Sequence, residues 1–108
     1  MSDATVLDRL YETILSRRGG EPERSHTARL FAKGTPKIAQ KLGEEAFEAV
    51  IAGVTGDRAN LAHESADLLY HLLVLWVDCG IAPAEVWKKL AAREGTSGLA
   101  EKAARPLT

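Results

Sequence analysis

Residues 57–79 form the longest stretch of the chain without proline or glycine, and this stretch constrains the fold most strongly. Asp57 is a residue type that caps helix starts and Gly80 one that ends helices, so we expect one long helix. From residue 68 to residue 77 its side chains are apolar nearly all round, apart from His71. Such a helix is normally buried, and an apolar run of ten residues is too short to cross a membrane, which takes about 20. We therefore expect the central helix of a core.

The remaining glycines and prolines divide the chain into further helical segments. Residues 5–18 have apolar side chains at three- and four-residue spacing, which predicts an amphipathic helix ended by Gly19 and Gly20. Thr35 is the expected N-cap of a helix that begins at Pro36. No segment alternates apolar and polar residues, so we expect an all-α fold of four to five helices. The four main helices are expected over residues 5–18, 36–52, 58–79 and 83–93, with a short last one over 99–104. The connector between residues 21 and 36 has room for one further short helix, over 27–33.

Composition limits the classes of function. With 108 residues the chain is expected to be a single domain, residues 1–108, and fourteen basic against fifteen acidic residues give a net charge of −1. This charge provides no electrostatic reason to bind nucleic acid or a membrane surface. The one cysteine, Cys79, excludes an intrachain disulfide and is expected to be a small core residue. The polar N-terminus has no secretion signal, so we expect a cytoplasmic protein.

Two acidic pairs are the candidate functional residues. Glu45 and Glu48 are three residues apart, as are Glu64 and Asp67, so each pair faces one side of its helix. If the pairs converge, carboxylates about 4 Å apart repel by roughly 4 kcal/mol at an effective dielectric near 20, so a cation is needed. Ligands that are all oxygen favour Mg²⁺, with Mn²⁺ as a substitute.

Basic residues share the helical face of the first acidic pair. Lys37, Lys41, Glu44 and Glu48 form one stripe, which suits a polyphosphate substrate: the lysines neutralise phosphates and a carboxylate takes a proton from water. Hydrolysis at phosphorus is the chemistry this set predicts. Two plainer interpretations stay open, because the lysines and glutamates also suit a solvated face with ion pairs, and Glu64 and Asp67 suit a helix N-terminus. We expect His71 to be a core histidine whose ring nitrogens have hydrogen-bond partners. Asp78 lies further along the same helical face and is a weaker candidate for the acidic site.

These residues carry a resemblance to a known family. The pattern Glu45-x-x-Glu48, a gap of fifteen residues and Glu64-x-x-Asp67 resembles the metal-binding signature of the all-α, MazG-like nucleotide pyrophosphohydrolases. Within that group the chain resembles the phosphoribosyl-ATP pyrophosphatases of histidine biosynthesis from about residue 7 to residue 105. The strings that carry this resemblance are KIAQKLGEEAFEAVIAG (37–53), ESADLLYHLLVLWVDCGI (64–81) and REGTSGLAEKAAR (93–105).

The resemblance implies a MazG-like helical bundle completed by dimerisation. It also implies Mg²⁺-dependent cleavage of phosphoribosyl-ATP between the α- and β-phosphates, to phosphoribosyl-AMP and pyrophosphate. The residues to which it assigns roles are Glu45, Glu48, Glu64 and Asp67 as metal ligands, Glu44 and Glu48 in catalysis, and Lys37 and Lys41 in phosphate binding.

The chain also departs from the family pattern. Ser25-His26-Thr27-Ala28 stands where the resemblance leads one to expect Ser-Tyr-Thr-Ala. Many such proteins are fused to a cyclohydrolase, whereas we expect this chain to act alone or with a separate phosphoribosyl-AMP cyclohydrolase. Two other functions stay open: a house-cleaning pyrophosphohydrolase of free (d)NTPs, and a non-catalytic helical dimerisation module.

Overall fold

The computed structural model describes residues 2–95, 98 and 102–103, and it confirms the predicted all-α fold. No strand occurs among these residues. Most of the predicted last helix, residues 99–104, lies outside the described residues. The five helices are α1 (Thr5–Arg17), α2 (His26–Lys33), α3 (Thr35–Thr55), α4 (Arg58–Cys79) and α5 (Pro83–Ala91).

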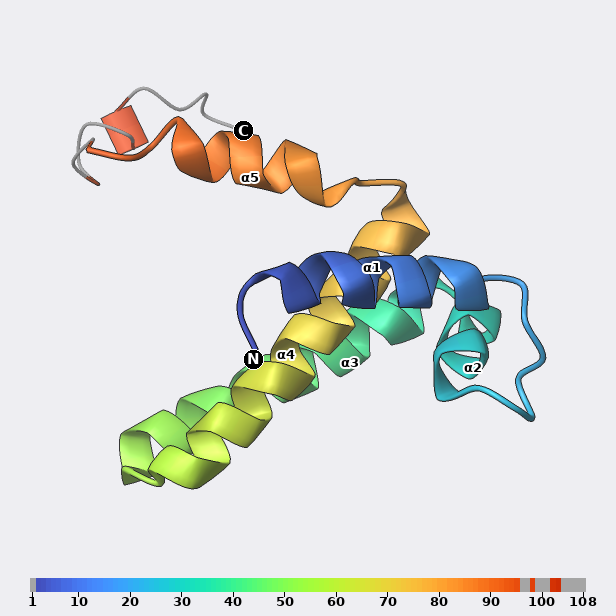
Figure 1. Cartoon of the computed structure of the whole chain (residues 1–108). Helices are drawn as coiled ribbons and strands as arrows, with labels where there is room; N and C mark the ends of the chain where they lie inside the picture. Colours follow the sequence, from blue (N-terminus) through green and yellow to red (C-terminus); the bar gives the residue numbers. More distant parts are fainter. Residues whose placement is uncertain (1, 96–97, 99–101, 104–108) are drawn as a thin grey trace.

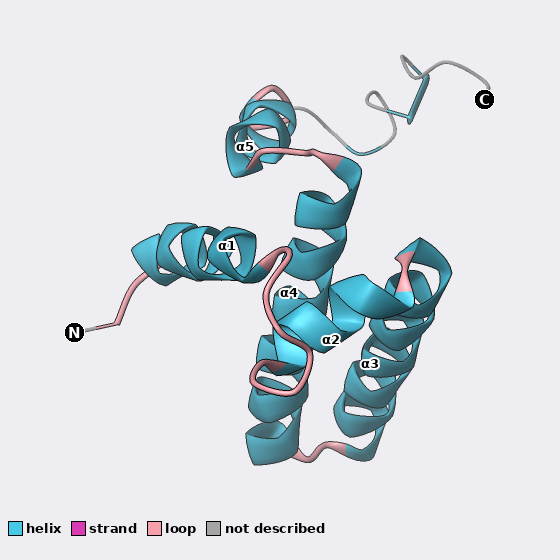
Figure 2. Cartoon of the chain, turned by 90° about the vertical axis from the view of Figure 1, so that its right-hand side faces the viewer, coloured by secondary structure: helices cyan, strands magenta, loops and turns pink. Residues whose placement is uncertain are grey.

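The two longest helices, α3 and α4, form an antiparallel pair, and theirs is the most extensive helix contact in the fold (Figures 1 and 2). α1 packs across α4, and α2 packs against the start of α3. Hydrogen bonds tie α1 to the end of α4: the Tyr11 hydroxyl donates to the Ile81 carbonyl at 3.0 Å, and Arg18 Nη1 donates to the Val77 carbonyl at 3.0 Å. α5 projects away from this group, with Trp87 edge-on to Trp76 at 5.9 Å between ring centroids.

The core lies where the first four helices meet, and α4 contributes half of its large buried side chains. These are Ile14, Leu30, Ile38, Leu73, Val74 and Val77. The predicted central position of residues 58–79 is thus confirmed. Burial is one-sided, however, because Leu69 remains 42% exposed and the helices in the described ranges leave it uncovered.

Two predicted boundaries of α3 are wrong. Gly34, rather than Thr35, is the N-cap, with a φ of +89° that glycine adopts without steric cost. Thr35 is already helical, and its Oγ1 donates to Asp78 Oδ2 at the end of α4. The helix also continues through Gly53 and ends at Gly56, which is left-handed with a φ of +74°. An interior glycine costs only about 1 kcal/mol, so packing against α4 can carry the helix past it.

The start of α4 follows the prediction: Asp57 Oδ1 accepts a hydrogen bond from the Asn60 amide at 3.1 Å, as an N-cap should. Cys79 contradicts the prediction, because it is exposed at the last residue of α4, although Val77 in the same turn is buried in the core. No single helix in the described part of the chain is long and apolar enough to span a membrane. α4 and α5 reach that length and composition only together, bent by 112°.

Candidate functional site

The structure brings the two acidic pairs toward each other across the α3–α4 contact. Glu45, Glu64 and Asp67 are half-buried, whereas Glu48 and Glu44 are exposed. The pKa of Glu64 is raised, first by its partial burial and then by the nearby carboxylates of Glu45, Asp67 and Glu48. Glu45, Glu48 and Asp67 therefore all lie close enough to Glu64 to raise its pKa. Binding of metal by these four residues stays a prediction.

A histidine that the sequence reasoning missed joins the α4 pair. His63, Glu64 and Asp67 present ligand atoms that all lie within 4.8 Å of one another, the one such group of three found among the described residues. His63 Nε2 lies 3.4 Å from Asp67 Oδ2. The available signal was position: His63 precedes Asp67 by four residues, which places both on one helical face. Glu45 and Glu48 lie outside this tight group.

The basic residues of α3 border the acidic group. Lys37 and Lys41 are both half-buried. Lys41 Nζ is 3.9 Å from Glu44 Oε1, a pair of the kind that the solvated-face interpretation predicts. A contact of this length and exposure contributes at most about 1 kcal/mol, so Lys41 can exchange Glu44 for another anion. The pair is therefore compatible with a phosphate role for Lys41.

His71 is a core histidine, as predicted, but it is not fully satisfied. It is 7% exposed, and Nδ1 lies 2.8 Å from the Asp67 carbonyl oxygen. Because a carbonyl only accepts, Nδ1 carries the hydrogen and Nε2 is left as an acceptor in the neutral ring. Nε2 is buried and has no hydrogen-bond partner within the described ranges. Most buried polar groups do have a partner, so this atom calls for an explanation.

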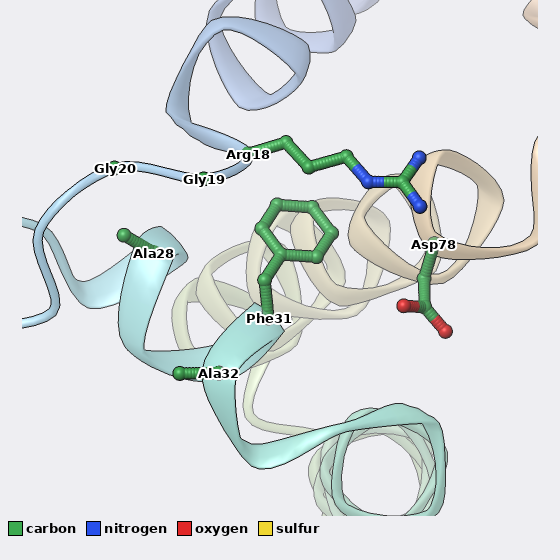
Figure 3. Close-up of a pocket in the computed structure, with 7 residues that line it drawn as sticks. All are labelled: Arg18, Gly19, Gly20, Ala28, Phe31, Ala32 and Asp78. Atoms are coloured by element: carbon green, nitrogen blue, oxygen red, sulfur yellow. The ribbon is translucent and has the colours of Figure 1, made fainter.

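Asp78 belongs to a different place on α4. Together with Arg18, Phe31 and the Gly19-Gly20 turn it lines a pocket of about 360 Å³ between α1, α2 and the end of α4 (Figure 3). The Arg18 side chain extends over the Phe31 ring toward α4. This pocket contains none of the predicted metal or phosphate residues.

An aromatic group at the start of α2 is the second feature that sequence reasoning missed. The rings of His26 and Tyr70 are nearly parallel, at 24°, with centroids 6.3 Å apart. The Tyr70 hydroxyl hydrogen-bonds Thr27 Oγ1 at 2.5 Å, with either oxygen able to donate. The pKa of His26 is lowered by desolvation and then by four surrounding groups that carry or can carry positive charge: His71, Arg29, Lys41 and Lys33.

The arrangement therefore places an oxygen-rich acidic group beside a basic one. Carboxylate oxygens are the ligands that Mg²⁺ prefers, and lysines neutralise phosphate as point charges. These are the parts needed to hold a polyphosphate with its metal ion and to take a proton from water. The geometry thus supports phosphoanhydride hydrolysis without specifying the substrate.

Comparison with known proteins gives a consistent result. Residues 7–94 match the family described as phosphoribosyl-ATP pyrophosphohydrolase. A phosphoribosyl-ATP pyrophosphatase of Azospirillum brasilense is 67% identical over 102 residues, which are 94% of this chain and 92% of that protein. Proteins of the same name from Gluconobacter oxydans and Paramagnetospirillum magneticum are 62% and 56% identical, over 94% and 95% of this chain and 76% and 94% of their own lengths.

Proposed function

The chain belongs to the phosphoribosyl-ATP pyrophosphohydrolase family, and we propose that it hydrolyses phosphoribosyl-ATP between the α- and β-phosphates with Mg²⁺ as cofactor. The products would be phosphoribosyl-AMP and pyrophosphate, in the second step of histidine biosynthesis. The observation that carries this proposal is the meeting of Glu45, Glu48 and Asp67 around Glu64 in a chain that matches the family over residues 7–94.

The donor set fits Mg²⁺. Glu45, Glu48, Glu64 and Asp67 offer only carboxylate oxygens. Partial burial and then repulsion from the other three carboxylates raise the pKa of Glu64, and a divalent cation would offset that repulsion. His63 adds a nitrogen donor beside them, which Mn²⁺ accepts more readily than Mg²⁺ does. When bound, the ion would polarise the phosphate oxygens and neutralise the charge that develops on them.

The chain's own residues would supply binding and proton transfer. Lys37 and Lys41 would contact the phosphates of the substrate. As Lys41 turns to phosphate it releases Glu44, its partner at 3.9 Å, so that the Glu44 carboxylate becomes free. Glu44 or Glu48 would then take a proton from the attacking water while the new P–O bond forms. The bond from the bridging oxygen to the attacked phosphorus breaks. If water attacks the α-phosphorus, pyrophosphate leaves with the bridging oxygen and its electron pair. If water attacks the β-phosphorus, the bridging oxygen stays with phosphoribosyl-AMP and pyrophosphate contains the oxygen of the water.

The uncovered face of α3 and α4 supports a homodimer. Its large apolar side chains are exposed, including Phe47 at 64% and Val54 at 82%; the set is Phe47, Val50, Ile51, Val54, Leu61 and Leu69. Contiguous apolar surface of this kind marks an interface. Phe47 directly precedes Glu48, so a second copy on this face would adjoin the acidic group. Phe47→Asp should shift the particle mass, measured by light scattering, from dimer to monomer, and an unchanged mass would contradict this interface.

Pyrophosphate release tests the proposed activity. We expect wild-type protein to release pyrophosphate from phosphoribosyl-ATP with Mg²⁺ and to stop when EDTA is added. Glu48→Gln should lose this activity, whereas Glu12→Gln, which changes an exposed carboxylate of α1, should keep it. Equal or faster turnover of dCTP or dUTP would instead assign a house-cleaning enzyme. Absence of turnover on every substrate would favour a dimerisation module.

A further inference from the structure

We propose that the paired rings of His26 and Tyr70 are the stacking surface for the purine base of the nucleotide, with His71 Nε2 as an acceptor for a donor on that nucleotide. This inference rests on the proposed function in one respect, namely that the ligand is an adenine nucleotide. It concerns binding rather than hydrolysis, so it can be tested separately.

The two rings have the geometry of an open stack. They are nearly parallel, at 24°, but their centroids are 6.3 Å apart, toward the wide end of the range in which aromatic rings interact. His26 is exposed and Tyr70 is half-buried, so one ring is anchored and the other faces solvent. A planar base can pack against such a pair by using the π-faces alone, which is how proteins hold single bases.

Tyr70 is fixed in place from two sides. Its hydroxyl is held by Thr27, and its ring meets the edge of His71 at 87° with 4.9 Å between centroids. A ring held in this way loses little conformational freedom when a ligand binds, which favours affinity. The anchoring also ties α2 to α4, so the stacking surface keeps its position relative to Asp67, which is one helical turn before His71.

The surroundings suit the rest of a nucleotide. Lys41, Arg29 and Lys33 are close enough to His26 to act on its charge, and Lys41 also contacts Glu44 of the acidic stripe. Lys41 therefore connects the aromatic pair with the metal-binding residues. A base at His26 would place its phosphates along this basic edge, where the proposed chemistry needs them.

The unpartnered nitrogen of His71 is the second, independent indication of a ligand. Nδ1–H is committed to the Asp67 carbonyl, so Nε2 can only accept a hydrogen bond in the neutral ring. Nε2 is buried without a partner in the described part of the chain, and the His71 ring lies close enough to affect His26 across the α2–α4 boundary. Because Nε2 is buried, a nucleotide contacts it only when a neighbouring side chain moves aside, and an N–H of the base or a hydroxyl of the ribose then has the chemistry to satisfy it.

Binding of adenosine 5′-monophosphate, measured by calorimetry on the full chain, tests the stacking surface. His26→Ala should weaken this binding about tenfold, whereas His26→Phe, which keeps an aromatic face, should retain it within about twofold. Ribose 5-phosphate, which lacks the base, should bind equally to all three proteins. Equal binding of the monophosphate to wild type and His26→Ala, or an equal loss for ribose 5-phosphate, would overturn the proposal. Neither readout depends on turnover, so failure of the proposed hydrolysis would be seen separately.

A second variant tests the acceptor. His71→Leu removes a buried unpartnered nitrogen, so a purely structural histidine should leave binding unchanged at equal or higher thermal stability. The proposal instead expects weaker binding of adenosine 5′-monophosphate in a folded protein. If the donor is the exocyclic amino group, purine riboside 5′-monophosphate should show no loss with this variant. If it is a ribose hydroxyl, the 2′-deoxy nucleotide should show none. Unchanged affinity for all three nucleotides in folded His71→Leu would overturn the acceptor role.

Discussion

The two ends of α4 carry carboxylates with opposite surroundings. Near its start, Glu64 and Asp67 lie among other acids, and the pKa of Glu64 is raised first by partial burial and then by these neighbouring carboxylates. At its end, Asp78 accepts a hydrogen bond from Thr35 and shares a pocket with Arg18. Acids whose partners come from the protein itself hold the structure together, whereas crowded acids are suited to a cation from outside. We therefore propose that the two ends of α4 have different roles, metal binding at the start and a structural hydrogen bond at the end.

The largest expected effect is on turnover, from Asp67→Asn. We expect pyrophosphate release to fall by about 10²-fold or more, because the variant lacks one of the four proposed metal ligands. The free energy of unfolding without Mg²⁺ should stay equal or rise slightly, since repulsion with Glu64 is relieved. Chemical denaturation with and without Mg²⁺ measures both effects. A large fall in the free energy of unfolding without Mg²⁺ would contradict the interpretation that Asp67 and Glu64 repel each other in the metal-free protein.

The next effect should appear in substrate affinity. Lys41→Gln removes a cation at the border of the acidic group, so KM should rise about tenfold with a smaller change in kcat, as expected for a charge that contacts phosphate. Lys89→Gln, at an exposed position on α5, is the matched control and should leave KM unchanged. A fall in kcat alone would show that Lys41 does not contribute to ground-state binding.

The opposite end of α4 should respond in stability rather than activity. Asp78→Asn weakens the acceptor for Thr35, and we expect the free energy of unfolding to fall by about 1 kcal/mol. Thr35→Val should cost a similar amount, and the double variant should cost less than the sum of the two. kcat of the folded protein should be unchanged. A loss of turnover comparable to that of Asp67→Asn would abolish the proposed division of α4.

The smallest effect concerns pH and His26. The folded-state pKa is lowered by desolvation and by nearby positive groups, so the unfolded chain binds the proton more readily. His26 therefore contributes stability that is present above its ordinary pKa of about 6.5 and is lost as pH falls through the lowered value. Denaturation curves at several pH values should show a smaller decline on acidification for His26→Phe. An identical decline in both proteins would contradict this electrostatic environment.

Much of the fold could be predicted from the sequence because strong local signals mark it. Asp57 and Gly80 bound α4, and both act as the caps that their chemistry suggests. Gly34 and Thr35 show where local signals conflict, since both residue types cap helices and only the tertiary contact to Asp78 decides between them. The exposure of Cys79 was missed because the average burial of free cysteine does not say which side of a helix end faces the core, and Val77 two residues earlier is the buried one.

The candidate site was predicted where helical spacing alone determines position. Glu64 and Asp67 share a face by spacing, and the packing of α3 on α4 brings Glu45 and Glu48 to it. The stacking of His26 on Tyr70 could not be predicted, because these residues are far apart in sequence and meet only through the fold. The unpartnered nitrogen of His71 depends on burial and tautomer, which a sequence does not contain.

The tight turn between α3 and α4 sets the relative positions of the acidic residues along the two helices. Glu48 lies eight residues before Gly56, and Glu64 lies seven residues after Asp57, so both stand at nearly the same height above the turn. Glu45 and Asp67 stand one further turn up, again at matching heights. If α3 or α4 were one helical turn longer between the turn and its acidic pair, the two pairs would be offset along the helix axes by about 5.4 Å, while each side chain would stay on nearly the same face of its helix. The acidic group therefore depends on the nearly equal number of residues between the turn and each acidic pair as much as on the residue types.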